Sequence, residues 1–174
     1  MAQRHLVISA IGADNVGLVE KISKFVSENG ANIEDSKMAV FCGDFAIIML
    51  VSGSAESLTA IESKQSQLAE ETKLAVFTKR ASERKKSDST RFRLVASSLD
   101  HPGIVYKITS SLSEFGINIE SMETKSYYAP TSGAPMFRFE AEITIPKSTD
   151  LSKLQTYFAV IGEQESIDIT VIAD

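Results

Sequence analysis

Hydrophobic side chains recur with two different periods in the first part of the chain. Leu6, Ile8 and Ala10 are separated by single residues, which is the period-2 pattern of a strand with one face in a core. The next apolar residues recur at the spacings of a helix with one buried face: Leu18, Val19, Ile22, Phe25 and Val26. The pattern therefore predicts a strand followed by an amphipathic helix.

The same region continues with a hairpin and a second helix. Residues 33–41 and 45–51 have strand composition, and residues 42–44 between them predict a tight turn. A weaker helix begins near Ser54, with an apolar side made by Leu58, Ile61 and Leu68. Residues 72–78 predict a last strand. The order of elements is β-α-β-β-α-β.

Polar residues, glycine and proline mark where these elements end. We expect Asp14 to cap the helix that follows it, because an aspartate oxygen accepts hydrogen bonds from first-turn amides. Asn29 and Gly30 end that helix, since glycine readily takes the left-handed conformation found just past a helix. In the second half of the chain, Pro102 suits the first turn of a helix, where its missing N–H costs nothing.

One signature occurs twice, at an offset of 86 residues. Five polar or glycine positions of the first region match five of the second: Asp14, Gly17, Gly30, Asn32 and Glu34 with Asp100, Gly103, Gly116, Asn118 and Glu120. The alternating residues Phe92, Leu94 and Ala96 stand at the same offset from the first strand. A constant offset through so many positions indicates that one structural unit has been duplicated.

The second region predicts the same order of elements. After Gly116 we expect a strand to about Tyr128, and then a longer, irregular hairpin loop at residues 129–135. Every second residue of the next strand is apolar: Phe137, Phe139, Ala141, Ile143 and Ile145. The helices carry apolar faces made by Ile104, Val105, Ile108 and Leu112, and by Leu151, Leu154, Phe158 and Ile161. Gly162 lies near the end of the second helix, and residues 166–172 close the region.

These patterns predict an α+β protein made of two tandem ferredoxin-like domains. A β-α-β-β-α-β unit places both helices on one face of a four-stranded antiparallel sheet. We assign residues 1–78 to the first domain, residues 79–90 to a basic linker and residues 91–174 to the second domain. Because edge strands present unpaired N–H and C=O groups, the two units are suited to pair into one continuous eight-stranded sheet.

Composition narrows the class of protein further. The length of 174 residues and the apolar share of 43% suit two packed domains. No apolar run approaches the ~20 residues that span a membrane, and Met1 leads almost directly into a strand, so we expect no membrane segment and no secretory signal. Cys42 is the only cysteine, which favours a reducing, cytoplasmic setting. The net charge of −5 argues against direct nucleic acid binding, which needs a basic face.

The linker is the basic exception in an acidic chain. Its five basic residues less Glu83 and Asp88 give it a charge of +3, so the remainder carries −8. A basic run could contact acidic lipid or nucleic acid. We favour a solvated linker, because so short a stretch gives little affinity at physiological salt.

Six repeated residues have the chemistry of an amino-acid site: Asp14, Gly17, Asn32, Asp100, Gly103 and Asn118. The glycines let a ligand approach the backbone, and free first-turn N–H groups beside them can bind a carboxylate. The aspartates can accept hydrogen bonds from an ammonium group, and the asparagine carboxamides can donate to a carboxylate or accept from an amine. Together these groups match the backbone part of an α-amino acid.

A simpler interpretation explains the same residues. Each aspartate then only caps a helix, and each asparagine or glycine only makes a turn. Duplication does not separate the two interpretations, because a repeated fold repeats its caps.

No catalytic, metal or cofactor site is predicted. His5 and His101 fall in different units, and neither stands at metal-ligand spacing from cysteines or carboxylates. An adjacent Asp–His pair in a turn is not a nucleophile–base–orienter set. Cys42 in a hairpin turn is interpreted as an incidental thiol. Tyr127 and Tyr128 could mark an RNA-binding sheet of the same element order, but the chain lacks the basic aromatic motif of such sheets.

The repeated motif resembles a known family. Asp-x-x-Gly-[Leu/Ile]-Val followed by Gly-x-Asn-Ile-Glu is similar to the ACT domain, a regulatory module that binds amino acids. The resemblance covers residues 5–78 and 91–172. Two ACT units without a catalytic domain resemble the glycine cleavage system transcriptional repressor family, and residues 32–36 and 45–53 are especially similar to that group. The resemblance implies a ferredoxin-like fold, side-by-side sheet pairing, and ligands at the interface between units.

The resemblance also implies site residues and partners. The ligand positions would be Asp14, Gly17, Leu18, Asn32, Asp100, Gly103, Ile104 and Asn118. The implied partners are an amino acid, with glycine or serine as the candidates, a transcription factor that reads the DNA, and a second copy in a homodimer. The first repeat has Asn15-Val16 where the second has His101-Pro102, so the two loops differ in stiffness.

Three functions remain open at this point. We prefer a non-catalytic regulator that senses an amino acid and controls transcription through a partner transcription factor. The alternative is a ligand-free interaction module that uses the ACT fold as an association surface. An enzyme is the third, and the missing catalytic set argues against it.

Overall fold

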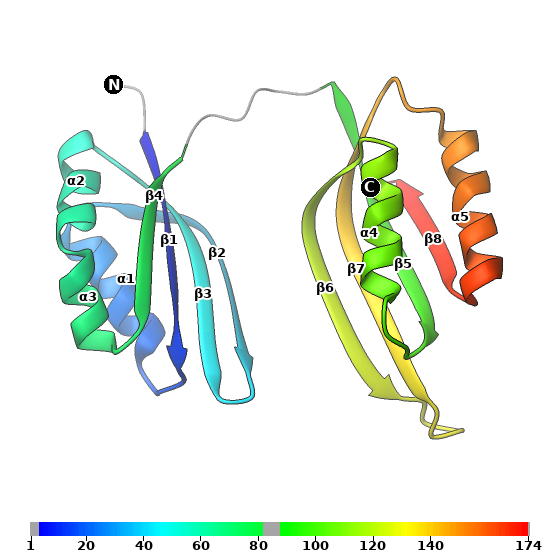
Figure 1. Ribbon diagram of the computed structural model, residues 1–174. Coiled ribbons are helices and arrows are strands. Elements are labelled where there is room, and N and C mark those ends of the chain that lie inside the picture. Colours follow the sequence, from blue (N-terminus) through cyan, green and yellow to red (C-terminus); the bar gives the residue numbers. More distant parts are fainter. Residues whose placement is uncertain (1–3, 82–87, 174) are drawn as a thin grey trace. The chain divides into compact units, whose positions relative to one another are not determined.

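A computed structural model describes residues 4–81 and 88–173 of the chain (Figure 1). The chain divides into two compact units, residues 1–84 (unit 1) and 85–174 (unit 2). Each unit contains a four-stranded antiparallel sheet with helices packed on one face. The predicted α+β class and the tandem ferredoxin-like fold are therefore confirmed.

The described part of unit 1 contains four strands and three helices: β1 (Arg4–Ala13), α1 (Leu18–Glu28), β2 (Asn32–Phe41), β3 (Asp44–Gly53), α2 (Ala55–Ser63), α3 (Gln65–Thr72) and β4 (Ala75–Arg80). The strand order in the sheet is β2-β3-β1-β4. The two central strands are β1 and β3, and the edges are β2 and β4.

The described part of unit 2 contains four strands and two helices: β5 (Ser89–Leu99), α4 (Ile104–Glu114), β6 (Asn118–Tyr128), β7 (Pro135–Pro146), α5 (Leu151–Glu165) and β8 (Asp168–Ala173). The strand order is β6-β7-β5-β8, which is the order of unit 1 with each strand replaced by its repeat. The pairing of the two sheets into one remains a prediction.

The side chains between each sheet and its helices form two separate cores. The predicted inward positions of the central strands β1 and β5 are buried: Leu6, Ile8, Ala10, Leu94 and Ala96. The predicted stripe of α1 is buried through Leu18, Ile22, Phe25 and Val26. Val19, at the edge of that stripe, is 42% exposed. The two hydrophobic periods thus located the core of each unit.

Both first helices begin later than the sequence pattern predicts. Their first residues are Leu18 and Ile104, and the N-cap residues are Gly17 and Gly103, with φ of 90° and 98°. Neither helix has a side-chain N-cap hydrogen bond. The expectation that Asp14 caps its helix is therefore wrong.

Hydrogen bonds to the neighbouring hairpins explain the late start. The Asp14 N–H donates to the carbonyl oxygen of Gly43 at 2.8 Å, and the Asp100 N–H donates to that of Pro135 at 2.9 Å. Each bond extends the pairing of the first strand by one residue, so the chain turns into the helix only further on. Pro102 consequently precedes the N-cap of α4. The expectation that it lies in the first turn of the helix is therefore wrong.

The second helix of the repeat differs between the units. In unit 1 it is interrupted at Lys64, which separates α2 from α3, whereas α5 of unit 2 is continuous. Ser54 caps α2 by accepting a hydrogen bond from the Ser57 N–H at 3.1 Å. Gly162 lies inside α5, where a Cβ would stand 2.7 Å from the carbonyl oxygen of Ile167. The close return of the chain after α5 therefore requires glycine at that position.

The ends of the predicted linker belong to the two sheets. β4 extends to Arg80 and β5 begins at Ser89, so the first two and last two residues of the predicted linker are paired in strands. Residues 82–87 in its centre lie outside the described residues.

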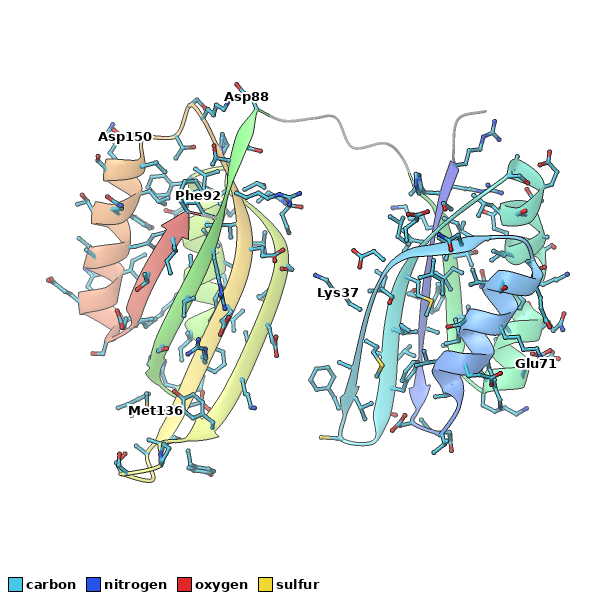
Figure 2. All side chains as sticks on the ribbon, turned by 180° about the vertical axis from the view of Figure 1, so that it is seen from behind. Lys37, Glu71, Asp88, Phe92, Met136 and Asp150 are labelled. Atoms are coloured by element: carbon cyan, nitrogen blue, oxygen red, sulfur yellow. The ribbon has the colours of Figure 1, made fainter. Side chains whose placement is uncertain are left out.

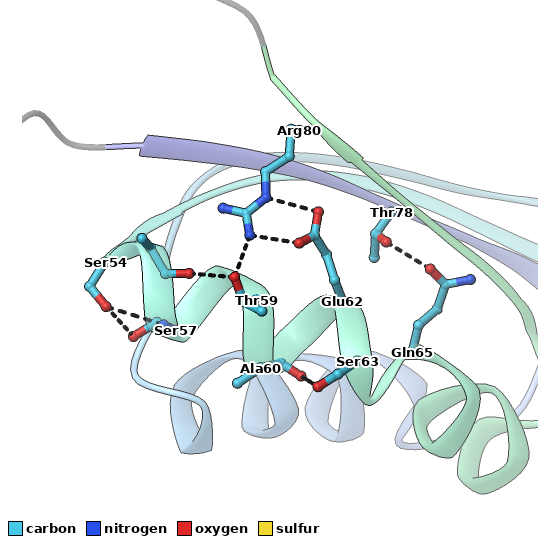
Figure 3. A network of polar contacts seen from close by, with 10 residues as sticks. Ser54, Ser57, Thr59, Ala60, Glu62, Ser63, Gln65, Thr78 and Arg80 are labelled. Carbon is cyan, nitrogen blue, oxygen red and sulfur yellow. Dashed lines mark hydrogen bonds and ion pairs between the residues drawn. The ribbon is translucent and has the colours of Figure 1, made fainter.

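Arg80 joins β4 to the helix layer of unit 1 (Figure 3). Its Nε and Nη2 donate to the Glu62 carboxylate at 2.8 and 2.6 Å, and Nη2 also donates to Thr59 Oγ1 at 2.9 Å. The Thr78 hydroxyl donates to Gln65 Oε1 at 2.7 Å. A residue that looks like part of a basic linker in the sequence thus has a structural contact with α2.

Candidate ligand-binding site

The strand-to-helix loops are alike in the two units. In both, a glycine N-cap with a left-handed backbone precedes the first helix, and the aspartate three residues earlier is exposed. A Cβ at Gly17 or Gly103 would meet nothing within 4 Å, so backbone conformation and not crowding requires glycine there. Because no side chain of the N-cap accepts from the first-turn amides, these amides remain suited to an anion.

The backbone of each loop is fixed although its aspartate side chain is exposed. The N–H groups of Lys21 and Lys107 donate to the carbonyl oxygens of Gly17 and Gly103, both at 3.0 Å. The side chains of Leu18 and Ile104 are buried in the cores, at 3% and 2% exposure. These two predicted site residues therefore present no exposed side chain to a ligand.

The predicted asparagines lie in a second repeated arrangement, at the start of β2 and β6. In unit 1, Glu34 Oε1 accepts a hydrogen bond from Ser52 Oγ at 2.5 Å and from Asn32 Nδ2 at 3.4 Å. These hydrogen bonds, that from Ser52 first, lower the pKa of the Glu34 carboxyl. Glu34 sits where the pairing of β2 with β3 shifts register, between Ile33 and Asp35.

Unit 2 repeats this arrangement. Glu120 Oε1 accepts from Asn118 Nδ2 and from Thr144 Oγ1, both at 2.8 Å. The register shift recurs as well, between Ile119 and Ser121. In both units the bulge turns a glutamate towards the asparagine, and the glutamate holds one N–H of the carboxamide. The sequence showed that these glutamates repeat, but it did not show that they bond the asparagines.

Within one unit the loop after the first strand and the start of the second strand lie at opposite ends of the sheet (Figure 1). Asn32 is opposite Ser52, which is opposite His5 near the start of β1, whereas Asp14 follows the last residue of that strand. The intervening part of β1 separates these ends by roughly 26 Å, at about 3.3 Å per residue. Within one unit, a single amino acid therefore cannot contact both groups.

Unit 2 has separate surface pockets beside its strand-to-helix loop and beside its asparagine. One of about 440 Å³ is lined by Gly103, Ile104 and neighbouring residues, among them Tyr106 and Phe137. Another of about 390 Å³ lies around Asn118. Tyr106 and Phe137 were not predicted as site residues. The alternation of β7 indicated only that Phe137 faces the helices, and not that it stands beside the loop.

Three further properties concern metal binding, the single thiol and membrane spanning. Among the described residues, no group of three or more His, Cys, Asp or Glu side chains is placed to hold a metal ion. Cys42 is exposed in the hairpin turn between β2 and β3. None of the helices within residues 4–81 and 88–173 is long and apolar enough to cross a membrane.

Comparison with known proteins places this geometry in a family. A family model for the ACT domain matches residues 4–79. The glycine cleavage system transcriptional repressor of Escherichia coli (strain K12) is 30% identical over 161 residues, which cover 92% of this chain and 85% of that protein. The similarity thus extends over almost all of this chain and most of that protein.

Solved structures show the same fold. A protein of unknown function from Galdieria sulphuraria is 29% identical, with a TM-score of 0.81 over 99% of both chains. A protein proposed to be a glycine cleavage system transcriptional repressor is 24% identical, with a TM-score of 0.71 over the full length of both chains, and this likeness concerns the fold alone. The chain belongs to the family of tandem ACT-domain proteins that includes the glycine cleavage system transcriptional repressor.

Proposed function

We propose that this chain is a cytoplasmic, non-catalytic regulator that senses an amino acid and controls transcription through a partner transcription factor. Its family supports the regulatory role, since the E. coli relative is a transcriptional repressor. The observation that carries the sensing role is the repeated loop. There an exposed aspartate stands three residues before a left-handed glycine N-cap that has no side-chain cap hydrogen bond.

The chemistry of the loop suits the two charges of an α-amino acid. The first-turn amides at Leu18 or Ile104 would bind the carboxylate, and the aspartate of the same loop would accept from the ammonium group. The asparagine of the same unit would not take part in this contact, since the two groups of one unit lie at opposite ends of its sheet. A small side chain suits an open loop, so glycine and serine are the first ligands to test.

The test of this proposal is calorimetry with glycine and with serine on the wild type and on Asp100→Asn. Asp100 does not cap α4, so the change should leave the stability of unit 2 unaltered. Loss of a carboxylate that faces a desolvated ammonium group should cost roughly 2 to 5 kcal/mol of binding free energy. Asp14→Asn tests the other loop in the same way, and Asn118→Ala tests the carboxamide.

Asp150→Asn is the matched control. Asp150 is a real N-cap, because its Oδ1 accepts from the N–H groups of Ser152 and Lys153 at 3.0 and 3.2 Å. Asparagine also caps well, so this variant should keep both stability and affinity. Unchanged affinity in both Asp100→Asn and Asp14→Asn, beside measurable binding by the wild type, would place the site elsewhere.

A second function, a ligand-free interaction module, is favoured by one specific observation. One N–H of each asparagine carboxamide is already held by a glutamate, at 3.4 Å in unit 1 and 2.8 Å in unit 2. A thermal-shift screen against the common amino acids separates the two functions. A ligand at about 100 times its dissociation constant adds about 2.7 kcal/mol of stability. No shift with any amino acid, together with binding to a transcription factor, would favour the module.

A further inference from the structure

The side of the unit 1 sheet that faces away from its helices is apolar, and we call this surface the open face of unit 1. Ile11, Ile48 and Phe77 project from it and are 53%, 50% and 63% exposed. Val7 and Leu50 lie beside them and are half-buried. The strand register places these residues together, because opposed residues of antiparallel strands point to the same side.

The open face of unit 1 has a shallow depression on it. Its volume is about 420 Å³, and its lining includes Ile11, Ala46 and Ile48 from the central strands and Lys37 and Ala39 from β2. Figure 2 shows Lys37 reaching out from β2 on the side of the sheet opposite the helices. A contiguous exposed apolar surface bordered by charges is typical of an interaction site.

Opposite charges flank the apolar centre on the two edge strands. Asp35 on β2 is opposite Leu50, which is opposite Val7, which is opposite Lys79 on β4. The four residues therefore form one level across the sheet. Asp35 and Lys79 are three strand spacings apart, about 14 Å, which is too far for an ion pair within one sheet. Both side chains are exposed.

We propose that the open face of unit 1 binds the same face of a second copy of this chain, about a two-fold axis parallel to the strands. Such an axis turns the order β2-β3-β1-β4 into β4-β1-β3-β2, so β2 of each copy lies over β4 of the other. Asp35 of each copy then meets Lys79 of the other. One level further along, Lys37 meets the ring of Phe77, a favourable cation–π arrangement.

The size of the face agrees with a specific but modest interface. Four strands at about 4.8 Å spacing and about 27 Å of strand length give roughly 500 Å² per copy. Two copies together cover about 1,000 Å², which reaches the lower limit of specific interfaces. We therefore expect a dimer whose dissociation constant lies in the micromolar range.

The corresponding face of unit 2 has the wrong chemistry to cover this surface. Four charged residues project from it: Arg93, Arg138, Glu140 and Glu142. They share one side of the sheet because Arg93 is opposite Glu142, and the other two are at alternate positions of the same strand as Glu142. Arg93 and Arg138 already pair with Glu140, and burying these charges against an apolar sheet would still carry the cost of removing them from water. A second copy of the apolar face, with complementary charges at its borders, is the better match. This inference does not depend on amino-acid binding.

Sedimentation velocity of the full chain over a range of concentrations tests the proposal. The wild type should change from one chain of 18.9 kDa to twice that mass as the concentration rises. Ile48→Asp should abolish the heavier species, because it places a carboxylate in the apolar centre. Ile172→Asp is the matched control: Ile172 is 52% exposed and is opposite Arg93 on the unit 2 sheet, and its change should leave the association unaltered. Circular dichroism checks that both variants are folded.

A charge exchange tests the two-fold arrangement itself. Asp35→Lys alone and Lys79→Asp alone should each weaken dimerisation about 10- to 100-fold, because each creates two like-charge contacts. The double variant Asp35→Lys/Lys79→Asp should restore association to about the wild-type level. A wild type that stays monomeric, an Ile48→Asp variant that still dimerises, or a double variant without rescue would each overturn the proposal.

Discussion

The open faces of the two sheets differ although the strands behind them are the same. In unit 1 the outward positions of the central strands include Ile11, Ile48 and Leu50. In unit 2 they include Arg93 and Glu140, which form an ion pair. Strand order, bulge and loop geometry are nevertheless repeated. The difference shows that the packed side of a duplicated sheet keeps its chemistry while the outward side is free to acquire a different role.

The largest expected effect tests whether the packed sides are equivalent. Ile22 in α1 and Ile108 in α4 are repeat partners, and both are fully buried. Ile22→Ala and Ile108→Ala should each cost about 2–5 kcal/mol, because each leaves a cavity in its core. Calorimetry should show that each variant lowers mainly the unfolding transition of its own unit. If both transitions shift equally in either variant, the two units do not unfold independently.

A smaller effect should come from the continuous second helix of unit 2. Gly162→Ala should destabilise unit 2 by about 1–3 kcal/mol, because the new Cβ would stand 2.7 Å from the Ile167 carbonyl oxygen. Ala159→Gly, at an exposed position of the same helix, is the control and should cost only about 1 kcal/mol through lost helix propensity. Urea unfolding measures both. A stabilising Gly162→Ala would mean that the chain after α5 relaxes away from the helix.

The strand-to-helix loops should respond alike. Gly17→Ala and Gly103→Ala should each cost about 1–2 kcal/mol, because both residues have a left-handed backbone and neither Cβ meets another atom. Gly→Asn at the same positions should cost less, since asparagine tolerates this conformation better. Urea unfolding measures these losses as well. A marked difference between the two Gly→Ala variants would indicate that His101-Pro102 stiffens the second loop.

The smallest expected effect concerns the pH dependence of stability that Glu34 of unit 1 and Glu140 of unit 2 contribute. Hydrogen bonds from Arg93 and then Arg138 hold the pKa of Glu140 below its ordinary value, and those from Ser52 and then Asn32 do so for Glu34. A carboxyl group whose pKa is lowered in the folded state stabilises that state at pH values above its ordinary pKa, near 4.5. This stabilisation is lost as the pH falls through the folded-state pKa. Thermal unfolding in this acid range should therefore become less pH-dependent in Glu140→Gln and in Glu34→Gln.

Salt sharpens that comparison. The partners of Glu140 are charged arginines, whose attraction is screened by added salt. The first partner of Glu34 is a neutral serine hydroxyl. High salt should therefore reduce the effect of Glu140→Gln on acid unfolding more than that of Glu34→Gln. Equal reduction would indicate that nearby charges also act on Glu34.

Some properties of this protein were determined by sequence alone because they depend on local periodicity. A period of two residues located Leu6 and Ile8 in a strand facing the core, and the helical period located Ile22 and Phe25. The constant offset between Asp14 and Asp100 identified the duplication, and with it the fold of both units. Each of these inferences uses only residues close together in the chain, or two copies of one pattern.

The tertiary structure decided what depends on contacts between distant residues. The Asp14 N–H bonds to Gly43 from the next hairpin, so the helix begins late and Asp14 is not its cap. Asp14 follows the last residue of β1 at one end of the sheet and Asn32 lies at the other end, so these two residues of the motif cannot share one ligand within a unit. The alternation of β1 and β3 was visible in the sequence, but only the register across four strands joins Asp35 and Lys79 on one level. Register depends on how the hydrophobic patterns of separate strands match and on the turns that join them, and no single strand contains that information.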